Sequence, residues 1–349
     1  MKGTKEFFIG LVLLVAAALL YLAFQNQTRE NGSITKSRPT VTVYVSEDRV
    51  FSEPVLQAFE KTTGIKVHAL YDTEEAKSTG VMNRLIAEKS HPHADVYWAN
   101  EPIRAEVLKQ RGIADVYHAP QAAGIPDRFK DKEGYWCGFS ARARVLLVKK
   151  GLSDPPDSIE AYLDPRYKGR AVIANPLFGT TTAHIAALFS YWGDDRAQAF
   201  LRGLKHNDVA LATSNGDSAD LVAKGRYDFA LVDSDDAIAR IRRGEKVAMI
   251  YPDQKKDQMG LFLVPNAVVL IKGAPHPENA KKLIDFLLSK KSERMLAFAD
   301  CAQIPLHPDV PMPHDMRPID TLKIMPVDYG RVAKKLLQIQ PILKQWTME

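Results

Sequence analysis

The sequence YWCGFSARARVLLVK, residues 135–149, is long for a single β-strand and ends in the apolar run Val145–Val148. Most strands of globular proteins are shorter, so a strand of this length can pass from one sheet to another. A second long apolar segment, Leu261–Ile271, can bring the chain back. Two such crossings form a hinge, and they predict two lobes that share the chain between them.

Strand-like and helix-like segments alternate on both sides of the first crossing, which is typical of α/β proteins with helix-covered sheets. Strands are predicted at residues 41–45, 65–70, 94–98, 170–173, 209–211, 229–232 and 247–251. Helices are predicted at residues 52–64, 79–88, 103–110, after Gly179, before Gly225, and at 237–243, 280–288, 292–299 and 329–345. The predicted fold is therefore α/β, with a mixed sheet in each lobe. Lobe one holds residues 40–138 and 264–349, and lobe two holds residues 139–263.

The length, the charge and the motifs of the chain limit the classes of function that it can have. A chain of 349 residues suits two lobes better than one core. The net charge of +5 is modest and comes without a long basic run, so we expect no nucleic-acid partner. The sequence contains no glycine-rich phosphate loop, zinc-binding His-Glu pair or serine nucleophile elbow. We therefore assign no catalytic residue and no resident cofactor, and we expect that the protein is not an enzyme.

The N-terminus indicates export. Lys2 and Lys5 precede an apolar run over residues 7–24, which as a helix is roughly 27 Å long. Residues 1–24 are predicted to be a signal peptide or an uncleaved membrane anchor, and residues 25–39 a flexible tether. The protein is expected on the periplasmic or extracellular face, either tethered to the membrane by residues 7–24 or secreted after cleavage.

The sequence has two cysteines, Cys137 and Cys301, both in the part predicted to be exported. An oxidising compartment would permit a disulfide between them. Two separate buried thiols are the simpler interpretation.

Loops that follow strands are the expected place for ligand chemistry in such a fold. Here these loops are rich in acidic, hydroxyl and amide side chains. The residues assigned to ligand binding are Ser46, Asp48, Glu101, Arg142, Thr180, Thr181, Asn215, Asp235 and Asp236. Such a pocket fits a metal ion with a companion anion, or a small zwitterionic or aminated organic solute. Capping of helices that begin at these loops is a competing explanation.

Several segments carry a resemblance to a known family. They are VY at 43–44, FEKTTGIKV at 59–67, ADV at 94–96, GFSARARV at 138–145 and DPRYKGR at 164–170. In this order and spacing the chain resembles the periplasmic ferric-ion-binding proteins of ABC importers. The resemblance implies a two-lobed periplasmic-binding-protein-like fold of type II that closes on a ferric ion or another small polar solute. It also implies an importer permease as partner, a monomer, and no catalysis.

The metal site of that family does not carry over. Its members hold ferric ion with phenolates, usually an adjacent Tyr-Tyr pair after a strand of lobe two, where this chain has Asp235-Asp236. In the first loop, where the family has His or Tyr, this chain has Asp48-Arg49, and Thr180 stands where some members have a further Tyr. Asp48, Asp235 and Asp236 can still form an oxygen site for a transported ferric ion. The alternative ligand is a small aminated or phosphonate-type organic solute.

Two other roles stay open on the same fold. An uncleaved anchor would suit a membrane-tethered sensor of small molecules that signals to a partner. A hydrolase or transferase could also use two such lobes, although the missing motifs disfavour it. The first expectation remains a solute-binding component of an ABC importer.

Overall fold

The structure is a computed structural model that describes residues 38–72 and 79–348. The predicted signal or anchor and nearly all of the predicted tether lie outside the described residues. Within the described residues, no helix is both long and apolar enough to cross a membrane. Contacts between residues divide the chain into Met1–Pro39 and Thr40–Glu349, and the fold is that of the second unit.

The strands are β1 (Thr40–Val45), β2 (Lys66–Tyr71), β3 (Val96–Ala99), β4 (Ala114–Asp115), β5 (Cys137–Lys149), β6 (Ala171–Ala174), β7 (Ala210–Ala212), β8 (Phe229–Asp233), β9 (Val247–Ile250) and β10 (Leu263–Ile271). The α-helices are α2 (Arg49–Thr63), α3 (Thr79–Ala87), α4 (Pro102–Gln110), α5 (Gly179–Trp192), α6 (Asp194–His206), α7 (Asn215–Ala223), α8 (Ser234–Arg242), α9 (Pro277–Leu287), α10 (Lys290–Phe298) and α11 (Tyr329–Met348). Short 3₁₀ helices are η2 (Pro120–Ala122), η3 (Asp127–Phe129), η4 (Ile159–Leu163), η5 (Pro165–Tyr167) and η6 (Ile319–Thr321). The predicted alternation of strands and helices is confirmed, with boundaries that differ by a few residues.

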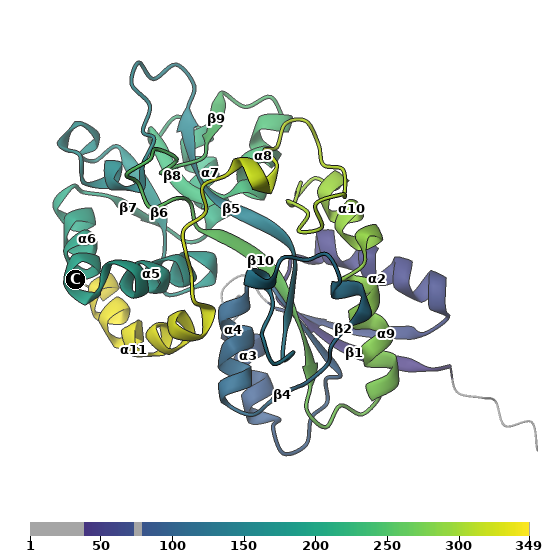
Figure 1. Ribbon diagram of the computed structural model, residues 1–349. Coiled ribbons are helices and arrows are strands. Elements are labelled where there is room, and N and C mark those ends of the chain that lie inside the picture. The colour runs from purple at the N-terminus through teal and green to yellow at the C-terminus, as the bar shows by residue number, and fades with distance from the viewer. Residues whose placement is uncertain (1–37, 73–78, 349) are drawn as a thin grey trace, which may run out of the picture. The chain divides into compact units, whose positions relative to one another are not determined.

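The two crossing strands hold the architecture together. The strand order is β2-β1-β3-β10-β5-β8-β6-β7, with parallel pairs at both ends and antiparallel pairs in the middle. The first half of β5 pairs with β10, and its second half pairs with β8 and β9. Figure 1 shows β5 and β10 side by side between two groups of helices. The mixed α/β fold expected from the crossings is confirmed.

The burial of β5 and β10 explains why both strands can run unbroken from one lobe to the other. Twelve of the 13 residues of β5, and all nine of β10, are buried. Strands covered on both faces are close to continuously apolar, because neither face meets water. The sequence of β5 departs from that pattern at Arg142 and Arg144, so these two buried charges need partners.

Helix α11 contacts helices of both predicted lobes. It packs against both α5 and α4, and Figure 1 shows it in yellow beside α5. The indole Nε1 of Trp346 donates a hydrogen bond to the carbonyl oxygen of Leu201, 2.8 Å away in α6. The C-terminal part of residues 264–349, which we assigned to lobe one, therefore also packs on helices of residues 139–263.

Cys137 lies in β5 and Cys301 follows α10. In the described part of the chain each is a buried free thiol. The simpler interpretation of the two cysteines thus agrees with the structure.

Candidate functional site

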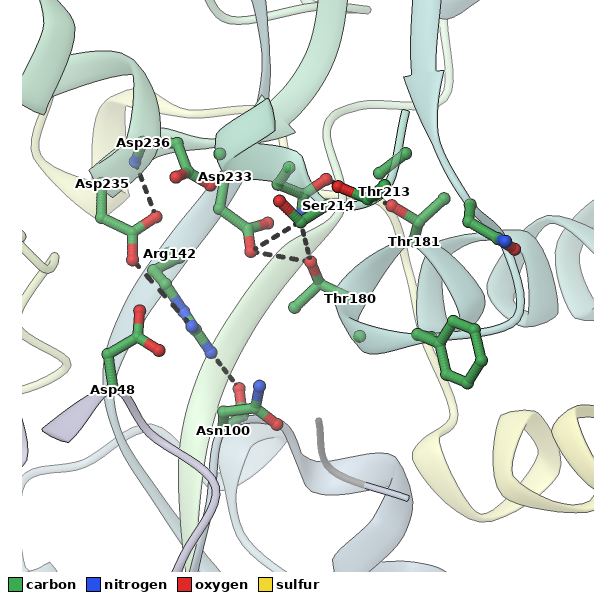
Figure 2. A pocket seen from close by; sticks show the side chains of 16 residues that line it. Asp48, Asn100, Arg142, Thr180, Thr181, Thr213, Ser214, Asp233, Asp235 and Asp236 are labelled. Carbon is green, nitrogen blue, oxygen red and sulfur yellow. Dashed lines mark hydrogen bonds and ion pairs between the residues drawn. The ribbon is translucent and has the colours of Figure 1, made fainter. Parts of the chain in front are cut away.

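A cavity of about 120 Å³ lies where loops leave the carboxyl ends of five strands, β1, β3, β6, β7 and β8. The lining residues are Asp48, Asn100, Arg142, Ala174, Asn175, Phe178, Gly179, Thr180, Thr181, Thr213, Ser214, Asn215, Gly216, Asp233, Asp235 and Asp236. Seven of the nine residues assigned from the sequence are in this set. Figure 2 shows Asp48, Asp235, Asp236 and Arg142 on one side of the cavity and hydroxyl side chains on the other, with Asp233 between the two groups.

Three helices begin at the cavity. Helices α5, α7 and α8 follow the strands β6, β7 and β8, which lie next to one another in the sheet. The hydroxyl oxygen of Ser214 caps α7 by accepting a hydrogen bond from the amide of Asp217 at 3.0 Å. The amino ends of helices carry unpaired N–H groups and a partial positive charge. This edge of the cavity therefore favours an anionic group.

A buried ion pair organises that edge. The guanidinium of Arg144 donates to the carboxylate of Asp233 at 2.9 Å, and also to the side-chain oxygens of Thr180, Thr181 and Asn215 at 3.1–3.2 Å. Thr180 in turn donates its hydroxyl to Asp233 at 2.7 Å. One arginine thereby ties together the loops that begin α5, α7 and α8.

Arg142 links the cavity to the loops after β1 and β3. Its guanidinium donates to the carbonyl oxygen of Asn100, lies 3.3 Å from Glu47 and approaches Asp235 to 4.0 Å. Its side chain is 3% exposed. Burial alone would lower the pKa of Arg142, but the surrounding carboxylates outweigh it and raise the pKa. Arg142 is therefore a permanent positive charge at the carboxylate side of the cavity.

The acids of the cavity differ in their protonation. Burial raises the pKa of Asp235 to about 6, Arg142 opposes this rise, and the charges of Asp233 and Asp48 add to it. Burial acts in the same direction on Asp233, but Arg144 and Arg142 outweigh it and lower the pKa of that carboxyl. Asp233 is thus held ionised, while Asp235 is poised to gain or lose a proton near neutral pH.

Three carboxylates of the cavity could share a metal ion. Oxygen atoms of Asp233, Asp235 and Asp236 all lie within 4.8 Å of one another. This cluster includes Asp233 where the sequence suggested Asp48, which lines the same cavity from the loop after β1. The oxygens of Asp233 already accept bonds from Arg144 and Thr180. Among the described residues that line the cavity, none is a tyrosine.

Two residues assigned to ligand binding from the sequence, Ser46 and Glu101, form hydrogen bonds elsewhere in the protein. The hydroxyl of Ser46 is hydrogen bonded to Asp72 at 3.1 Å and to the phenol of Tyr97 at 3.0 Å. The carboxylate of Glu101 caps α4 and pairs with Arg104 at 2.8 Å, and both side chains are buried. Neither Ser46 nor Glu101 belongs to the lining of the cavity.

Asp233 is not among the residues assigned from the sequence, although it ends β8 two positions before Asp235. Its position in the run Asp233–Asp236 was the available signal, but helix capping explained the residue equally well. Arg142 and Arg144 alternate along β5, and the sequence does not tell which of the two faces which acid. The answer depends on β5 lying against β8, which pairs Arg144 with Asp233.

The chain is similar to known proteins over most of its length. Residues 55–317 match the family of bacterial extracellular solute-binding proteins. A putative 2-aminoethylphosphonate-binding periplasmic protein of Salmonella typhimurium is 28% identical over 260 residues, which cover 72% of this chain and 75% of that protein. Iron uptake protein A1 of Synechocystis sp. is 26% identical over 313 residues, 85% of each chain.

The same fold occurs among solved structures. Iron-bound HitA from Pseudomonas aeruginosa superimposes with a TM-score of 0.78 at 21% identity, over 87% of this chain and 99% of that one. This similarity confirms the predicted two-lobed fold of type II. With three quarters of its length matched by the family, the chain belongs to the bacterial extracellular solute-binding proteins.

Proposed function

We propose that this protein captures a small zwitterionic organic solute, with an ammonium group at one end and an oxyanion at the other. One observation carries the proposal: the cavity is lined by hydroxyls and helix amino ends on one side and by carboxylates on the other. Closure of the two lobes about β5 and β10 would enclose the solute, and the binding energy would shift the protein toward the closed form.

The hydroxyl side suits a phosphonate, phosphate or carboxylate. Thr180 and Thr181 lie in the first turn of α5, and Ser214 caps α7. Backbone amides at both helix ends can donate to oxyanion oxygens, and the helix dipoles favour the negative charge. The buried Arg144 behind these loops adds to the positive potential, although Asp233 offsets its charge.

The acidic side suits an ammonium group. Asp48, Asp235 and Asp236 line the cavity there. A primary ammonium has three N–H donors and no acceptor, so three carboxylates can satisfy it. A cation at this position would also favour the ionised form of Asp235, because opposite charges nearby lower the pKa of a carboxyl.

The volume of the cavity limits the solute. About 120 Å³ is the space of roughly four water molecules. Pockets for drug-sized ligands are several times larger. 2-Aminoethylphosphonate, named for one relative, carries both required charges on a two-carbon chain and is therefore the probe of choice.

A ferric ion is the second candidate, favoured by the cluster of Asp233, Asp235 and Asp236. Two features weigh against it. Asp233 is already neutralised by Arg144, and Arg142 places a second positive charge 4.0 Å from Asp235. A trivalent cation would meet stronger repulsion from both arginines than a monovalent ammonium group does, and it would lack phenolate ligands.

Thermal unfolding of the full chain tests the choice of ligand. We expect stabilisation by 2-aminoethylphosphonate, which at 100 times its Kd should add about 2.7 kcal/mol. Ethylphosphonate lacks the ammonium and ethylamine lacks the anion, so each should stabilise far less at the same concentration. Stabilisation by ferric nitrilotriacetate, with none by 2-aminoethylphosphonate, would reverse the order of the two candidates.

A matched pair of variants locates the two ends of the solute. Asp236→Asn should weaken binding of 2-aminoethylphosphonate and leave the weak binding of ethylphosphonate unchanged, because ethylphosphonate has no ammonium to lose. Asp194→Asn, which alters an exposed carboxylate that pairs with Lys335 outside the cavity lining, is the control. Equal losses for both ligands would contradict the assignment of the acidic side.

The role of the protein follows from what it does with the solute. We propose delivery to an ABC importer permease from the extracytoplasmic face, without conversion of the solute and with residues 7–24 as signal or anchor. Uptake of 2-aminoethylphosphonate by cells should be lost when this chain is deleted and restored by the wild-type chain. Conversion during incubation with stoichiometric protein, seen as a new ³¹P resonance, would instead indicate an enzyme. A tethered sensor would leave uptake intact.

A further inference from the structure

The crossing strand β5 has one irregular residue, Ser140, two positions before the cavity residue Arg142. Ser140 has a φ angle of 37°, in the left-handed region. Its neighbours Phe139 and Ala141 pair with β10, but a register shift at Asn266 leaves Ser140 outside the ladder. A residue other than glycine keeps this conformation where its surroundings hold it there.

Side chains satisfy both backbone groups of Ser140. Its amide donates to the carboxylate of Glu293 at 2.8 Å, and its carbonyl oxygen accepts from the side-chain amide of Asn266 at 2.7 Å. All three residues are fully buried. Buried backbone groups that leave the sheet need such partners, so the bulge is a supported feature of the hinge.

Both carboxylate oxygens of Glu293 have hydrogen-bond partners. Its Oε1 accepts from the amides of Ser140 and Leu306 at 2.8 and 2.9 Å. Its Oε2 accepts from the amide of His307 at 2.9 Å and lies 2.8 Å from the Nδ1 of the same ring. With three backbone N–H groups donating to this carboxylate, Nδ1 of His307 faces Oε2 as a fourth donor. Nε2 lies 3.1 Å from the carbonyl oxygen of Ala123, which can only accept. His307 is therefore a buried imidazolium paired with Glu293.

A series of contacts between buried polar side chains also leads from the bulge to the cavity. The amide of Asn266 also donates to Gln303 at 2.8 Å, and Gln303 donates to Glu47 at 3.0 Å. Glu47 lies 3.3 Å from the guanidinium of Arg142. Ser140 is thus connected to Arg142 by the strand itself and by this polar chain, which passes through the loop after β1.

We propose that Glu293 is a positioning residue of the solute site, because it holds the bulge of β5 at Ser140 and so sets where Arg142 meets the cavity. His307 orients the Glu293 carboxylate through its backbone amide and its ring Nδ1. Neither Glu293 nor His307 lines the cavity, so both act through the crossing strand.

The pair gives the hinge a defined dependence on pH. Burial would lower the pKa of His307, but Glu293 outweighs it and raises the pKa above its ordinary value of 6.5. The pair's stabilisation of the folded state is complete at pH values below that ordinary pKa. It is lost as the pH rises through the higher pKa of His307 in the folded protein.

Other titratable groups around Glu293 and His307 do not reverse this direction of the pH dependence. Asp309, close to His307 in sequence, pairs with Lys290 at 2.5 Å, and both are exposed. On β5, burial raises the pKa of Cys137 to about 12, so its thiol stays neutral. From the segment around η2, the ring meets the carbonyl oxygen of Ala123.

Hydrogen exchange of the full chain, followed by mass spectrometry over residues 137–143, tests the proposal without any ligand. Glu293→Gln should lower the protection factor at Ser140 about tenfold or more, because a charged acceptor is lost. Glu278→Gln, which changes an exposed carboxylate paired with Lys281, should leave it unchanged. In the wild type, protection should fall as the pH rises above 6.5, the ordinary pKa of His307, and through its higher folded pKa.

The binding test rests on the proposed function and uses 2-aminoethylphosphonate as probe. Glu293→Gln should weaken binding, and adding Ser140→Gly should restore it, because glycine adopts the left-handed conformation without support. The hydroxyl of Ser140 has no hydrogen-bond partner among the described residues, so its removal costs no bond. A purely structural role for Glu293 would not be rescued in this way.

The outcomes of these experiments distinguish the positioning role of Glu293 from the proposed function. Unchanged protection in Glu293→Gln, or pH-independent protection in the wild type, would overturn the positioning role whatever the ligand is. If Glu293→Gln does not fold, His307→Gln and the wild-type pH profile decide, with His276→Gln as the matched change in another His–carboxylate pair. Absence of binding to wild type would instead refute the proposed function and leave the exchange result standing.

Discussion

The guanidinium of Arg144 lies 2.9 Å from the carboxylate of Asp233, and both side chains are buried where β5 pairs with β8. This pair is the centre of the hydroxyl side of the cavity, because Arg144 also bonds to threonines of α5. Its removal should therefore affect both stability and binding.

We predict that Arg144→Met lowers the free energy of unfolding by about 3–5 kcal/mol, because it leaves the charge of Asp233 buried without a partner. Urea unfolding at pH 7 measures the change. Arg166→Met is the control, since Arg166 pairs with Asp154 and Asp164 at the surface. Exposed pairs contribute at most about 1 kcal/mol. Comparable losses in both variants would contradict the structural role of Arg144.

We predict that Asp235→Asn makes stability less dependent on pH. The folded pKa of Asp235 is about 6, raised from its ordinary value of 3.8 mainly by burial. Its contribution to stability is complete below the ordinary value and is lost as the pH rises through about 6. The variant should therefore be more stable than wild type by about 1–3 kcal/mol at pH 7.5, with little difference at pH 4.

Urea unfolding of both proteins at the two pH values provides the measurement for Asp235. Asp309→Asn, a change at an exposed carboxylate paired with Lys290, should show no gain at pH 7.5. A loss of stability in Asp235→Asn at pH 7.5 would mean that Arg142 outweighs burial at this site.

We predict that Thr181→Val weakens binding of 2-aminoethylphosphonate about tenfold, whereas the neighbouring Thr182→Val leaves it unchanged. The hydroxyl of Thr181 lies at the cavity and donates to Asn215 at 3.2 Å. The hydroxyl of Thr182 is buried outside the lining, and it has no hydrogen-bond partner within the described residues. Isothermal titration calorimetry of both variants compares the two hydroxyls. Equal effects would mean that valine acts through packing of α5.

We predict that removal of metal ions leaves the protein unaffected. Dialysis against EDTA should change neither Tm nor the affinity for 2-aminoethylphosphonate, because Arg144 and Thr180 already occupy the oxygens of Asp233. Differential scanning calorimetry before and after dialysis measures the effect. A fall in Tm that ferric nitrilotriacetate reverses, and that Asp236→Asn abolishes, would establish the metal site instead.

Local patterns explain how much of the site could be found from the sequence. Asp235, Asp236, Thr180 and Asn215 follow strands and begin helices, and parallel neighbouring strands bring such loops together. Glu101 and Ser46 follow the same rule, but their side chains turn to Arg104 and Tyr97. The rule places the loop correctly but does not tell which side chain faces the cavity.

By itself the sequence determined the order of strands and helices, the two crossing segments and the loops that meet at the cavity. These features depend on short-range periodicity and on runs of apolar residues, which are visible along the chain. The tertiary structure decided which charges meet. Arg144 and Asp233 are 89 positions apart, and Ser140 and Glu293 are 153 apart. Their protonation and orientation depend on burial and on pairing between distant strands and helices, and no local pattern records either.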